Sequence, residues 1–277
     1  MSEPRARAGL DRTPERSTWV LLRGLVRESR HWGDFPELLA ATSPGAAIVT
    51  PDLPGNGRLN REASPPRVSA MVDRLRADLA AAGHLPPFRL IALSLGGMAA
   101  ADWMHRFPAE VCAAVLINTS MRPYSPFYRR LRPHNYAALA LDALTGRDAA
   151  RHETAILRLV SNDDAKRRAA LPKWTAWARE RPVTRANALR QLAAAARFRA
   201  SGMPPDTPVL VLASTRDRLV DAACSRALAL AWNAPLIEHP RAGHDLPLDD
   251  GPWAAATIAR WWVMRNGARN AHSSGGG

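Results

Sequence analysis

The fold of this chain is decided by the stretch FRLIALSLGG, which occupies residues 88–97. Its first six residues are mostly apolar and predict a buried strand, and a helical pattern follows the two glycines. Ser94 stands in the turn between them, where a strand–turn–helix junction projects a serine hydroxyl above a sheet. Such a turn has room only for small residues two before and two after the serine, here Ala92 and Gly96. Ser94 is therefore a candidate nucleophile, with a plain serine N-cap as the alternative.

Apolar runs of this kind recur along the chain and alternate with helical patterns. They are apolar throughout, as expected of parallel strands that are covered on both faces. The strand candidates are Thr18–Leu22, Ala46–Thr50, Phe88–Leu93, Ala114–Asn118, Pro208–Ala213 and Pro235–His239. The helix candidates are Asp34–Ala41, Arg67–Ala82, Gly97–Arg106, Ala222–Trp232 and Pro252–Arg265. This alternation predicts an α/β fold with a doubly wound, mostly parallel sheet.

The alternation breaks between the fourth and fifth strand candidates. Residues 121–200 contain only helical stretches rich in Ala, Leu and Arg and interrupted by prolines. Because this interval is far longer than an ordinary connection, we expect an inserted helical subdomain. Ligands bind above the carboxyl edge of such a sheet, so the insertion is interpreted as a lid. The core then comprises residues 18–120 and 201–266, with a flexible N-terminus over residues 1–17 and a disordered tail over residues 267–277.

Two further motifs supply the partners that a serine nucleophile needs. Asp217 follows the fifth strand candidate, and His244 follows the sixth. A serine hydroxyl is a weak nucleophile until a neutral imidazole accepts its proton, and a carboxylate fixes the tautomer of that imidazole. The order Ser, Asp, His therefore predicts a catalytic triad of Ser94, Asp217 and His244. Asp221 and Asp245 are alternative acids, although the first is expected to cap a helix and the second adjoins the histidine.

The same chemistry needs two backbone N–H groups to stabilise the oxyanion. The N–H of Leu95 lies at the start of the helix after the serine, where the helix dipole adds to its effect. The second donor is expected in the loop after the first strand candidate, where Gly24 allows a close turn and Leu25 follows it. Leu25 and Leu95 are thus the predicted donors, with Gly24 and Gly96 as the loop and elbow glycines.

The charge of the chain is concentrated in the predicted lid. The formal net charge is +13, and residues 121–200 contain 17 Lys or Arg against 6 Asp or Glu, a balance of +11. Such a surface favours an acidic substrate or partner. Nucleic acid is not expected, because no aromatic stacking pattern accompanies the basic residues. An arginine-rich solvated face that reflects compositional bias is the alternative interpretation.

Other features narrow the class of protein. The chain has neither G-x-G-x-x-G nor G-K-[ST], and no His or Cys cluster has metal-site spacing, so no cofactor or metal is expected. Cys112 and Cys224 lie in apolar stretches and are expected to be buried thiols. The chain shows no apolar h-region at its start and no apolar stretch of the roughly 18–20 residues that a membrane span requires. We therefore expect a cytoplasmic protein.

Together these motifs resemble the α/β-hydrolase superfamily, in particular small bacterial carboxylesterases similar to the pimeloyl-acyl-carrier-protein methyl ester esterases. The resemblance extends from about residue 18 to 265. The matching pieces are Arg23-Gly24, Asp52-Leu53-Pro54-Gly55-Asn56-Gly57, Leu93-Ser94-Leu95-Gly96-Gly97, Asp217 and Gly243-His244. The family usually has His-Gly in place of Arg23-Gly24, so Arg23 either attracts an anionic substrate or points away from the site.

The resemblance implies the α/β-hydrolase fold and a serine hydrolase that cleaves a small-molecule carboxylic ester through an acyl-enzyme, without a cofactor. If the basic lid recognises an acidic partner, an acyl carrier protein is the best candidate, and an acyl-carrier-protein methyl ester esterase is an alternative function. Thioesterases, C–C bond hydrolases and acyltransferases share the triad and remain open. A protein of another class, a catalytically inactive binding protein on the same fold, also remains open.

Overall fold

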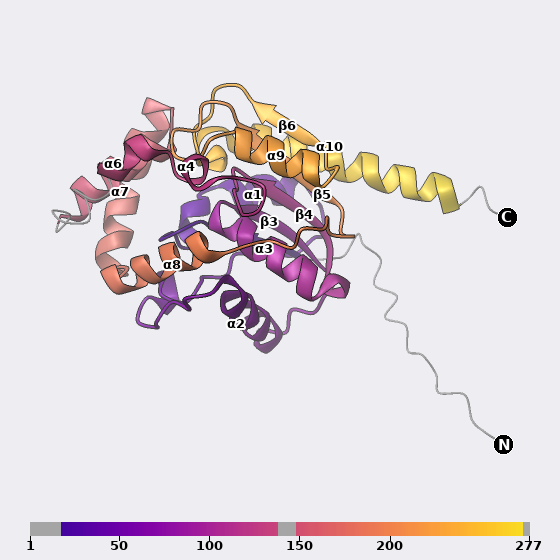
Figure 1. Cartoon of the computed structure of the whole chain (residues 1–277), viewed down its shortest axis with the longest axis horizontal. Helices are drawn as coiled ribbons and strands as arrows, with labels where there is room; N and C mark the ends of the chain where they lie inside the picture. The colour runs from indigo at the N-terminus through magenta and orange to yellow at the C-terminus, as the bar shows by residue number, and fades with distance from the viewer. Residues whose placement is uncertain (1–17, 138–147, 274–277) are drawn as a thin grey trace, which may run out of the picture.

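The structure is a computed structural model and describes residues 18–137 and 148–273. Its centre is a sheet of six parallel strands in the order β2-β1-β3-β4-β5-β6 (Figure 1). The strands are β1 (Thr18–Leu22), β2 (Ile48–Val49), β3 (Phe88–Leu93), β4 (Val111–Ile117), β5 (Val209–Ser214) and β6 (Leu236–His239). The predicted α/β class with a doubly wound parallel sheet is confirmed.

Helices cover both faces of this sheet. The core helices are α1 (Phe35–Thr42), α2 (Val68–Ala81), α3 (Leu95–Arg106), α9 (Ala223–Ala231) and α10 (Leu246–Ser273). Short 3₁₀ turns are η2 (Ser29–Trp32), η3 (Gly57–Leu59) and η4 (Pro108–Glu110). α1 packs beside α10 on one face, and α2 packs beside α3 on the other.

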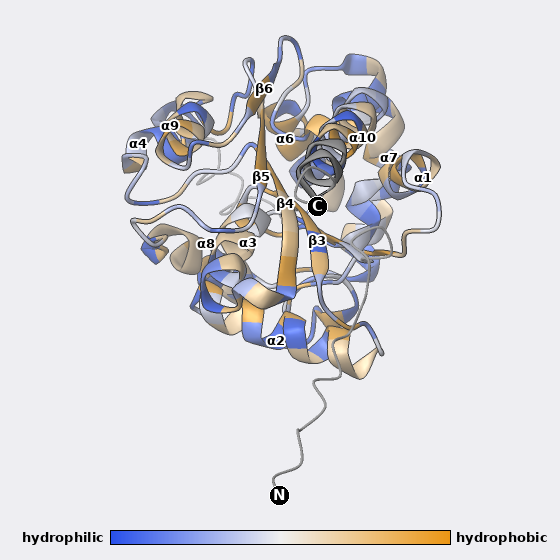
Figure 2. Ribbon diagram, turned by 90° about the vertical axis from the view of Figure 1, so that its right-hand side faces the viewer, coloured by the Kyte–Doolittle hydropathy of each residue, from blue (hydrophilic) through white to orange (hydrophobic). Residues whose placement is uncertain are grey.

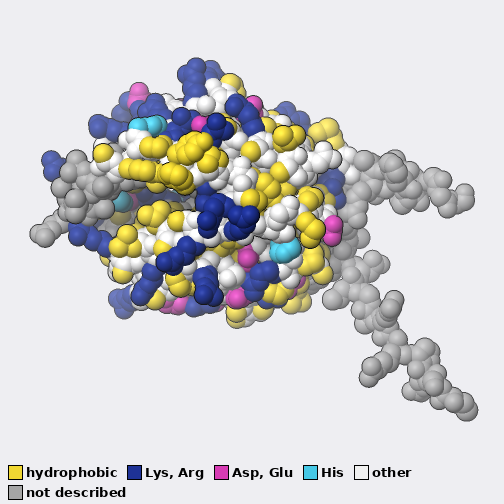
Figure 3. Space-filling model, in the orientation of Figure 1, with side chains coloured by type: hydrophobic (Ala, Val, Ile, Leu, Met, Phe, Trp, Pro, Cys, Tyr) yellow, Lys and Arg dark blue, Asp and Glu magenta, His cyan; other side chains and the backbone are white. Residues whose placement is uncertain are grey.

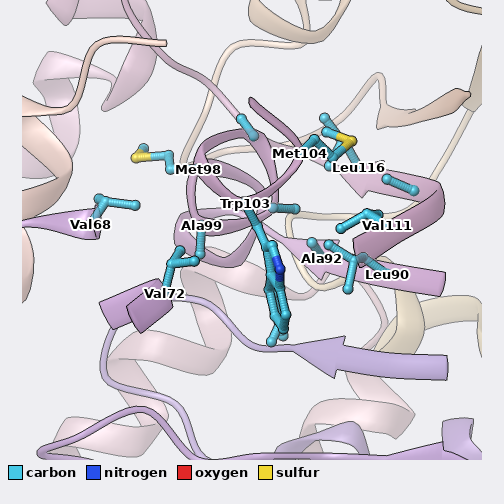
Figure 4. Packing of buried hydrophobic residues seen from close by; sticks show 14 of the residues in the cluster. Val68, Val72, Leu90, Ala92, Met98, Ala99, Trp103, Met104, Val111 and Leu116 are labelled. Carbon is cyan, nitrogen blue, oxygen red and sulfur yellow. The ribbon is translucent and has the colours of Figure 1, made fainter. Parts of the chain in front are cut away.

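Successive strand residues point to opposite faces and so build two separate hydrophobic cores. In β3, Leu90 and Ala92 pack toward α2 and α3, where Figure 4 shows them near Trp103. Ile91 and Leu93 pack on the other face with the residues of α1 and α10. Because both faces are covered, β3, β4 and β5 are mostly apolar, as Figure 2 shows.

The interval between β4 and β5 is helical, as expected. It contains α4 (Phe127–Arg130), η5 (Pro133–Asn135), α6 (Ala149–Val160), α7 (Asp164–Glu180) and α8 (Arg185–Arg197). Over its described residues, strand pairing is limited to an isolated bridge between Arg122 and Arg199. α6 and α7 pack on each other around a small core of their own that includes Leu157 and Trp174. We call residues 121–200 the lid.

Several boundaries differ from the predicted ones. β4 begins at Val111 rather than Ala114, because its start is apolar and pairs with β3. α10 continues to Ser273 and contains a kink at Asp250. The helix thus extends as far as Ser273 into the segment 267–277 that we expected to be disordered. The N-terminal segment 1–17 lies outside the described residues.

Two further expectations concern burial. Cys224 is buried as predicted, but Cys112 is only half-buried, and its Sγ donates a hydrogen bond to the carbonyl of Phe88. Within the described ranges, no helix is long and apolar enough to cross a membrane.

Candidate active site

Ser94 occupies a strained turn between β3 and α3. Its φ of 56° and ψ of −114° lie in a region that side chains other than glycine rarely adopt. Hydrogen bonds hold the turn, because the Ser94 N–H donates to the carbonyl of Ile117 at 3.0 Å and Thr119 Oγ1 donates to the Ser94 carbonyl at 2.8 Å. Within the described chain, the Ser94 side chain makes no capping hydrogen bond to α3, so the plain N-cap interpretation lacks geometric support.

The small residues around the serine are required by close backbone approach. A Cβ added at Gly96 would lie 2.3 Å from the carbonyl oxygen of Leu22, so only glycine lets α3 start this close to the end of β1. A Cβ added at Gly24 would lie 3.2 Å from the Cβ of Ser94. The loop that we expected to form the oxyanion hole therefore lies beside the candidate nucleophile.

His244 and Asp217 are brought together from the loops after β6 and β5. His244 Nδ1 and Asp217 Oδ2 are 2.6 Å apart, and both residues are buried. The other carboxylate oxygen, Asp217 Oδ1, accepts the N–H groups of Leu219 at 2.7 Å and Val220 at 2.9 Å. These bonds fix the carboxylate, which in turn holds the imidazole proton on Nδ1 and leaves Nε2 as the acceptor that a general base requires.

The two alternative acids have other partners. Asp221 Oδ1 accepts the N–H of Ala223 at 2.9 Å in the first turn of α9, which is the capping role expected for it. Asp245 forms an ion pair with Arg23, and both side chains are buried. Asp217 is thus the candidate acid that contacts His244.

The end of β4 ties the serine and histidine loops together. Asn118, with a φ of 46°, follows Ile117 directly and is buried. Its Nδ2 donates to the His244 carbonyl at 2.8 Å and to Ser214 Oγ at 3.0 Å, while its Oδ1 accepts the Ser214 N–H at 2.7 Å. The neighbouring Thr119 holds Ser94. We did not identify Asn118 as a site residue from the sequence, where it was only the last residue of a strand candidate.

The predicted oxyanion donors lie at the start of α3 and in the loop after β1. Leu95 is the first residue of α3, so its N–H is one of those for which a helix has no internal acceptor. Leu25 follows Gly24 and precedes Val26, which adopts a φ of 58°. The N–H of Val26 donates to Gln191 Oε1 of α8 at 2.8 Å, so the lid contacts this loop directly. We call residues 23–26, where the second donor is expected, the oxyanion loop.

Gln191 is the centre of a buried amide network that sequence reasoning missed. Its Nε2 donates to Asn56 Oδ1 at 2.9 Å and to Ser64 Oγ at 3.0 Å. One helical turn earlier, Asn187 Nδ2 donates to the Glu62 carbonyl at 2.8 Å. The available signal was two amides spaced i, i+4 on an alanine-rich helix, the spacing that places both on one face.

The turn over residues 52–57 has a structural role. Asp52 Oδ1 accepts the N–H of Ser29 at 2.7 Å, and Oδ2 accepts that of Arg58 at 2.9 Å. The turn therefore joins the segment after β1 to η3, and Asn56 carries the contact with the lid helix α8.

Helix α7 of the lid covers the basic segment that follows the oxyanion loop. His31 lies edge-on to the rings of Trp174 and Trp177, and the Arg27 guanidinium lies 4.8 Å from the Trp174 ring centroid. Burial lowers the pKa of His31 well below its ordinary value, and the charges of Arg27 and Arg23 lower it further. His31 is therefore a neutral packing residue.

The lid is also hydrogen-bonded to the loops that carry Asp217 and His244. The Val160 carbonyl accepts the N–H of Asp245 at 2.7 Å. Asn162 Nδ2 donates to the carbonyls of Arg216 and Arg241, each at 3.0 Å. Asp249 Oδ2 accepts from Asn162 N and Gly243 N at 2.9 and 2.7 Å.

Comparison with known proteins agrees with this architecture. The sequence model described as the alpha/beta hydrolase family matches residues 19–257. The chain belongs to the alpha/beta hydrolase family. The match includes the loops of Ser94, Asp217 and His244. The candidate site of this α/β hydrolase therefore lies within the matched residues.

Solved structures with similar folds belong to hydrolases of more than one kind. The esterase RhEst1 from Rhodococcus sp. ECU1013 has a TM-score of 0.70 at 21% identity, with 89% of this chain and 90% of that chain covered. A thermophilic esterase from Thermogutta terrifontis has a TM-score of 0.66 at 20% identity, with 90% of each chain covered. The 2-hydroxy-6-oxo-6-phenylhexa-2,4-dienoate hydrolase from Rhodococcus sp. strain RHA1 has a TM-score of 0.70 at 19% identity, with 91% of this chain and 92% of that chain covered. At such identities the likeness shows the fold and leaves the substrate open. No curated protein sequence matches the chain.

The contact between the lid and the oxyanion loop of this α/β hydrolase gives a first prediction. Replacing Gln191 by Leu removes the acceptor for Val26 N–H, so the loop loses its support from α8. We expect kcat for hydrolysis to fall by about 10-fold, because small misplacements of groups beside the candidate nucleophile are costly. Asn187→Leu is the matched control, since that amide contacts residues 62–64 and not the oxyanion loop. The melting temperature and kcat of both variants are measured and compared with those of the wild type. Equal losses of kcat in the two variants would contradict the prediction.

Proposed function

We propose that this α/β hydrolase cleaves carboxylic esters through an acyl-enzyme on Ser94. The observation that carries the proposal is the buried 2.6 Å hydrogen bond between His244 and Asp217. The loop of that histidine is tied through Asn118 and Thr119 to the strained turn of the serine. A serine, a base and an orienting acid on three separate loops is the arrangement that nucleophilic acyl transfer requires.

The reaction follows from these roles. Ser94 Oγ attacks the ester carbonyl carbon while His244 Nε2 takes the hydroxyl proton, and Asp217 stabilises the imidazolium. The N–H groups of Leu25 and Leu95 bind the oxyanion of the tetrahedral intermediate. His244 then gives its proton to the leaving alcohol, and the acyl group stays on Ser94. In the second half, His244 activates a water that attacks the acyl-enzyme and releases the carboxylic acid.

A fluorophosphonate probe and an ester panel test the proposal. Intact-mass and peptide analysis should find one phosphonylated residue, Ser94, and p-nitrophenyl esters of increasing acyl length should be hydrolysed at rates that depend on length. The Ser94→Ala variant is the control for labelling elsewhere. Absence of labelling in the folded protein would favour the inactive binding protein on the same fold.

The charge of the lid favours a second candidate within the same chemistry, hydrolysis of an ester or thioester carried by an acidic acyl carrier protein. Arg185, Arg190 and Arg197 are exposed on α8, the helix whose Gln191 reaches the oxyanion loop. Figure 3 shows Lys and Arg side chains beside hydrophobic ones on the face where α4 and α8 lie. Charges placed there would steer an acidic protein toward the site.

Removing these three arginines tests the carrier-protein candidate. Replacing Arg185, Arg190 and Arg197 by Ala should raise KM for a carrier-protein ester by about 10-fold at low salt, because electrostatic steering is lost. The difference from the wild type should shrink as salt screens the charges. A short neutral ester is the internal control and should show unchanged kcat and KM. Equal effects on both substrates would remove the carrier protein and leave a generic esterase.

A further inference from the structure

A buried ion pair joins the two loops on which the proposed chemistry depends. Arg23 directly precedes Gly24, and Asp245 directly follows His244. Arg23 Nη1 and Nη2 donate to Asp245 Oδ1 and Oδ2 at 3.2 and 2.5 Å, and each side chain is only 3% exposed. The guanidinium also lies over the ring of Trp32, 4.8 Å from its centroid. The two residues are 222 positions apart in the chain.

Stability alone does not account for such a pair. Taking two charges out of water costs nearly as much as their attraction returns, so apolar residues of similar size often fold as well in their place. The pair instead fixes the relative orientation of its two side chains, because the guanidinium meets the carboxylate through two parallel hydrogen bonds and stacks on a flat ring. Such a contact fixes the distance between two backbone segments more closely than apolar packing does.

We propose that Arg23 and Asp245 are positioning residues that hold the oxyanion loop in register with the histidine loop. The inference rests on the proposed function of Ser94 and His244. It resolves the two expectations for Arg23, whose side chain is committed to Asp245 and does not face a substrate. The loop of Gly24 and Leu25 is thereby held from one side by Asp245 and, through Val26, from the other by Gln191.

The chain provides a matched control for this pair. Arg27 directly follows the oxyanion loop, and its Nη1 donates to Glu153 Oε1 and Oε2 at 3.1 and 3.0 Å. This pair is largely buried, with side chains 10% and 3% exposed, and it also has its guanidinium over an indole ring, that of Trp174. Its carboxylate comes from α6 of the lid and not from the histidine loop. Asp245→Asn and Glu153→Gln therefore remove the same kind of contact with different consequences for the site.

Kinetics with a p-nitrophenyl ester separate positioning from stability. Both variants should melt at lower temperature, because each leaves a buried arginine without its carboxylate. Asp245→Asn should lower kcat by roughly 10- to 100-fold with little change in KM, since the oxyanion donors act on the transition state. Glu153→Gln should keep kcat within about 2-fold of the wild type. The double variant Arg23→Met with Asp245→Leu should recover the melting temperature and remain slow.

Two kinetic results would overturn the inference. One is recovery of kcat together with stability in the double variant, and the other is an equal loss of kcat in Glu153→Gln. Hydrogen exchange of the amides in residues 23–26 and 243–246 gives a readout that needs no activity, and exchange should be faster in Asp245→Asn than in Glu153→Gln. Equal exchange in the two variants would also contradict positioning. If the wild type is not labelled at Ser94, the proposed function fails, and the exchange rates still decide whether the pair holds the loops.

Discussion

Ser94→Ala is expected to keep the fold and to lose nearly all ester hydrolysis, with kcat lower by roughly 10³-fold or more. The variant removes only the hydroxyl that would attack the carbonyl, and alanine fits the turn as well as serine does. The half-buried side chain makes no capping bond to α3, so little stability should be lost. Initial rates with p-nitrophenyl butyrate and a thermal melt measure the two effects.

Thr119→Val is the control for damage to the elbow itself. It removes the 2.8 Å hydrogen bond from Thr119 Oγ1 to the Ser94 carbonyl without touching the nucleophile. We expect a loss of about 1 kcal/mol in the free energy of unfolding and a much smaller loss of kcat than in Ser94→Ala. Near wild-type turnover by Ser94→Ala would sink the nucleophile assignment.

His244→Ala is expected to be as damaging as the serine variant, because neither residue works without the other. The double variant Ser94→Ala with His244→Ala should be no slower than either single one, since residues that act as one unit are not additive. Measured kcat values for the three variants test this. A multiplicative loss in the double variant would show that the two side chains act independently.

The same measurement ranks the two candidate acids. Asp217→Asn keeps the shape of the side chain but cannot hold a charged imidazole, so we expect a loss of kcat of roughly 10²-fold or more, smaller than that of His244→Ala. Asp221→Asn should be nearly silent, because an asparagine oxygen can still accept the N–H of Ala223. The reverse ranking would transfer the role to Asp221.

The sequence predicted those parts of the fold that local pattern encodes. β1 and β3 begin and end where their mostly apolar runs do, because both strands are covered on both faces. The turn around Ser94 could also be predicted from local sequence, because the small residues that it requires, Ala92 and Gly96, lie within five residues of the serine. The helical nature of the lid followed from composition and length.

The contacts that support the site could not be predicted in this way. Gln191 meets Val26, and Arg23 meets Asp245, only after the chain has folded through 165 and 222 positions. The sequence next to Gln191 or Arg23 does not indicate which distant residue each of them contacts. Asn118 could not be predicted either, because an asparagine after a strand can have many roles. Only the structure shows that it bonds to Ser214 and to the His244 carbonyl.

The hydrogen bonds between the lid and the histidine loop have a consequence for how this hydrolase can vary. The carbonyl of Val160 accepts the N–H of Asp245, and the side-chain amide of Asn162 donates to the carbonyls of Arg216 and Arg241. The inserted helices are therefore not an interchangeable module, because exchanging them for those of another hydrolase would leave polar groups of the catalytic loops unsatisfied. The lid and the core should therefore melt as one cooperative unit. Substitutions of exposed side chains on α8 should alter the substrate range with less damage than substitutions at residues 160–162.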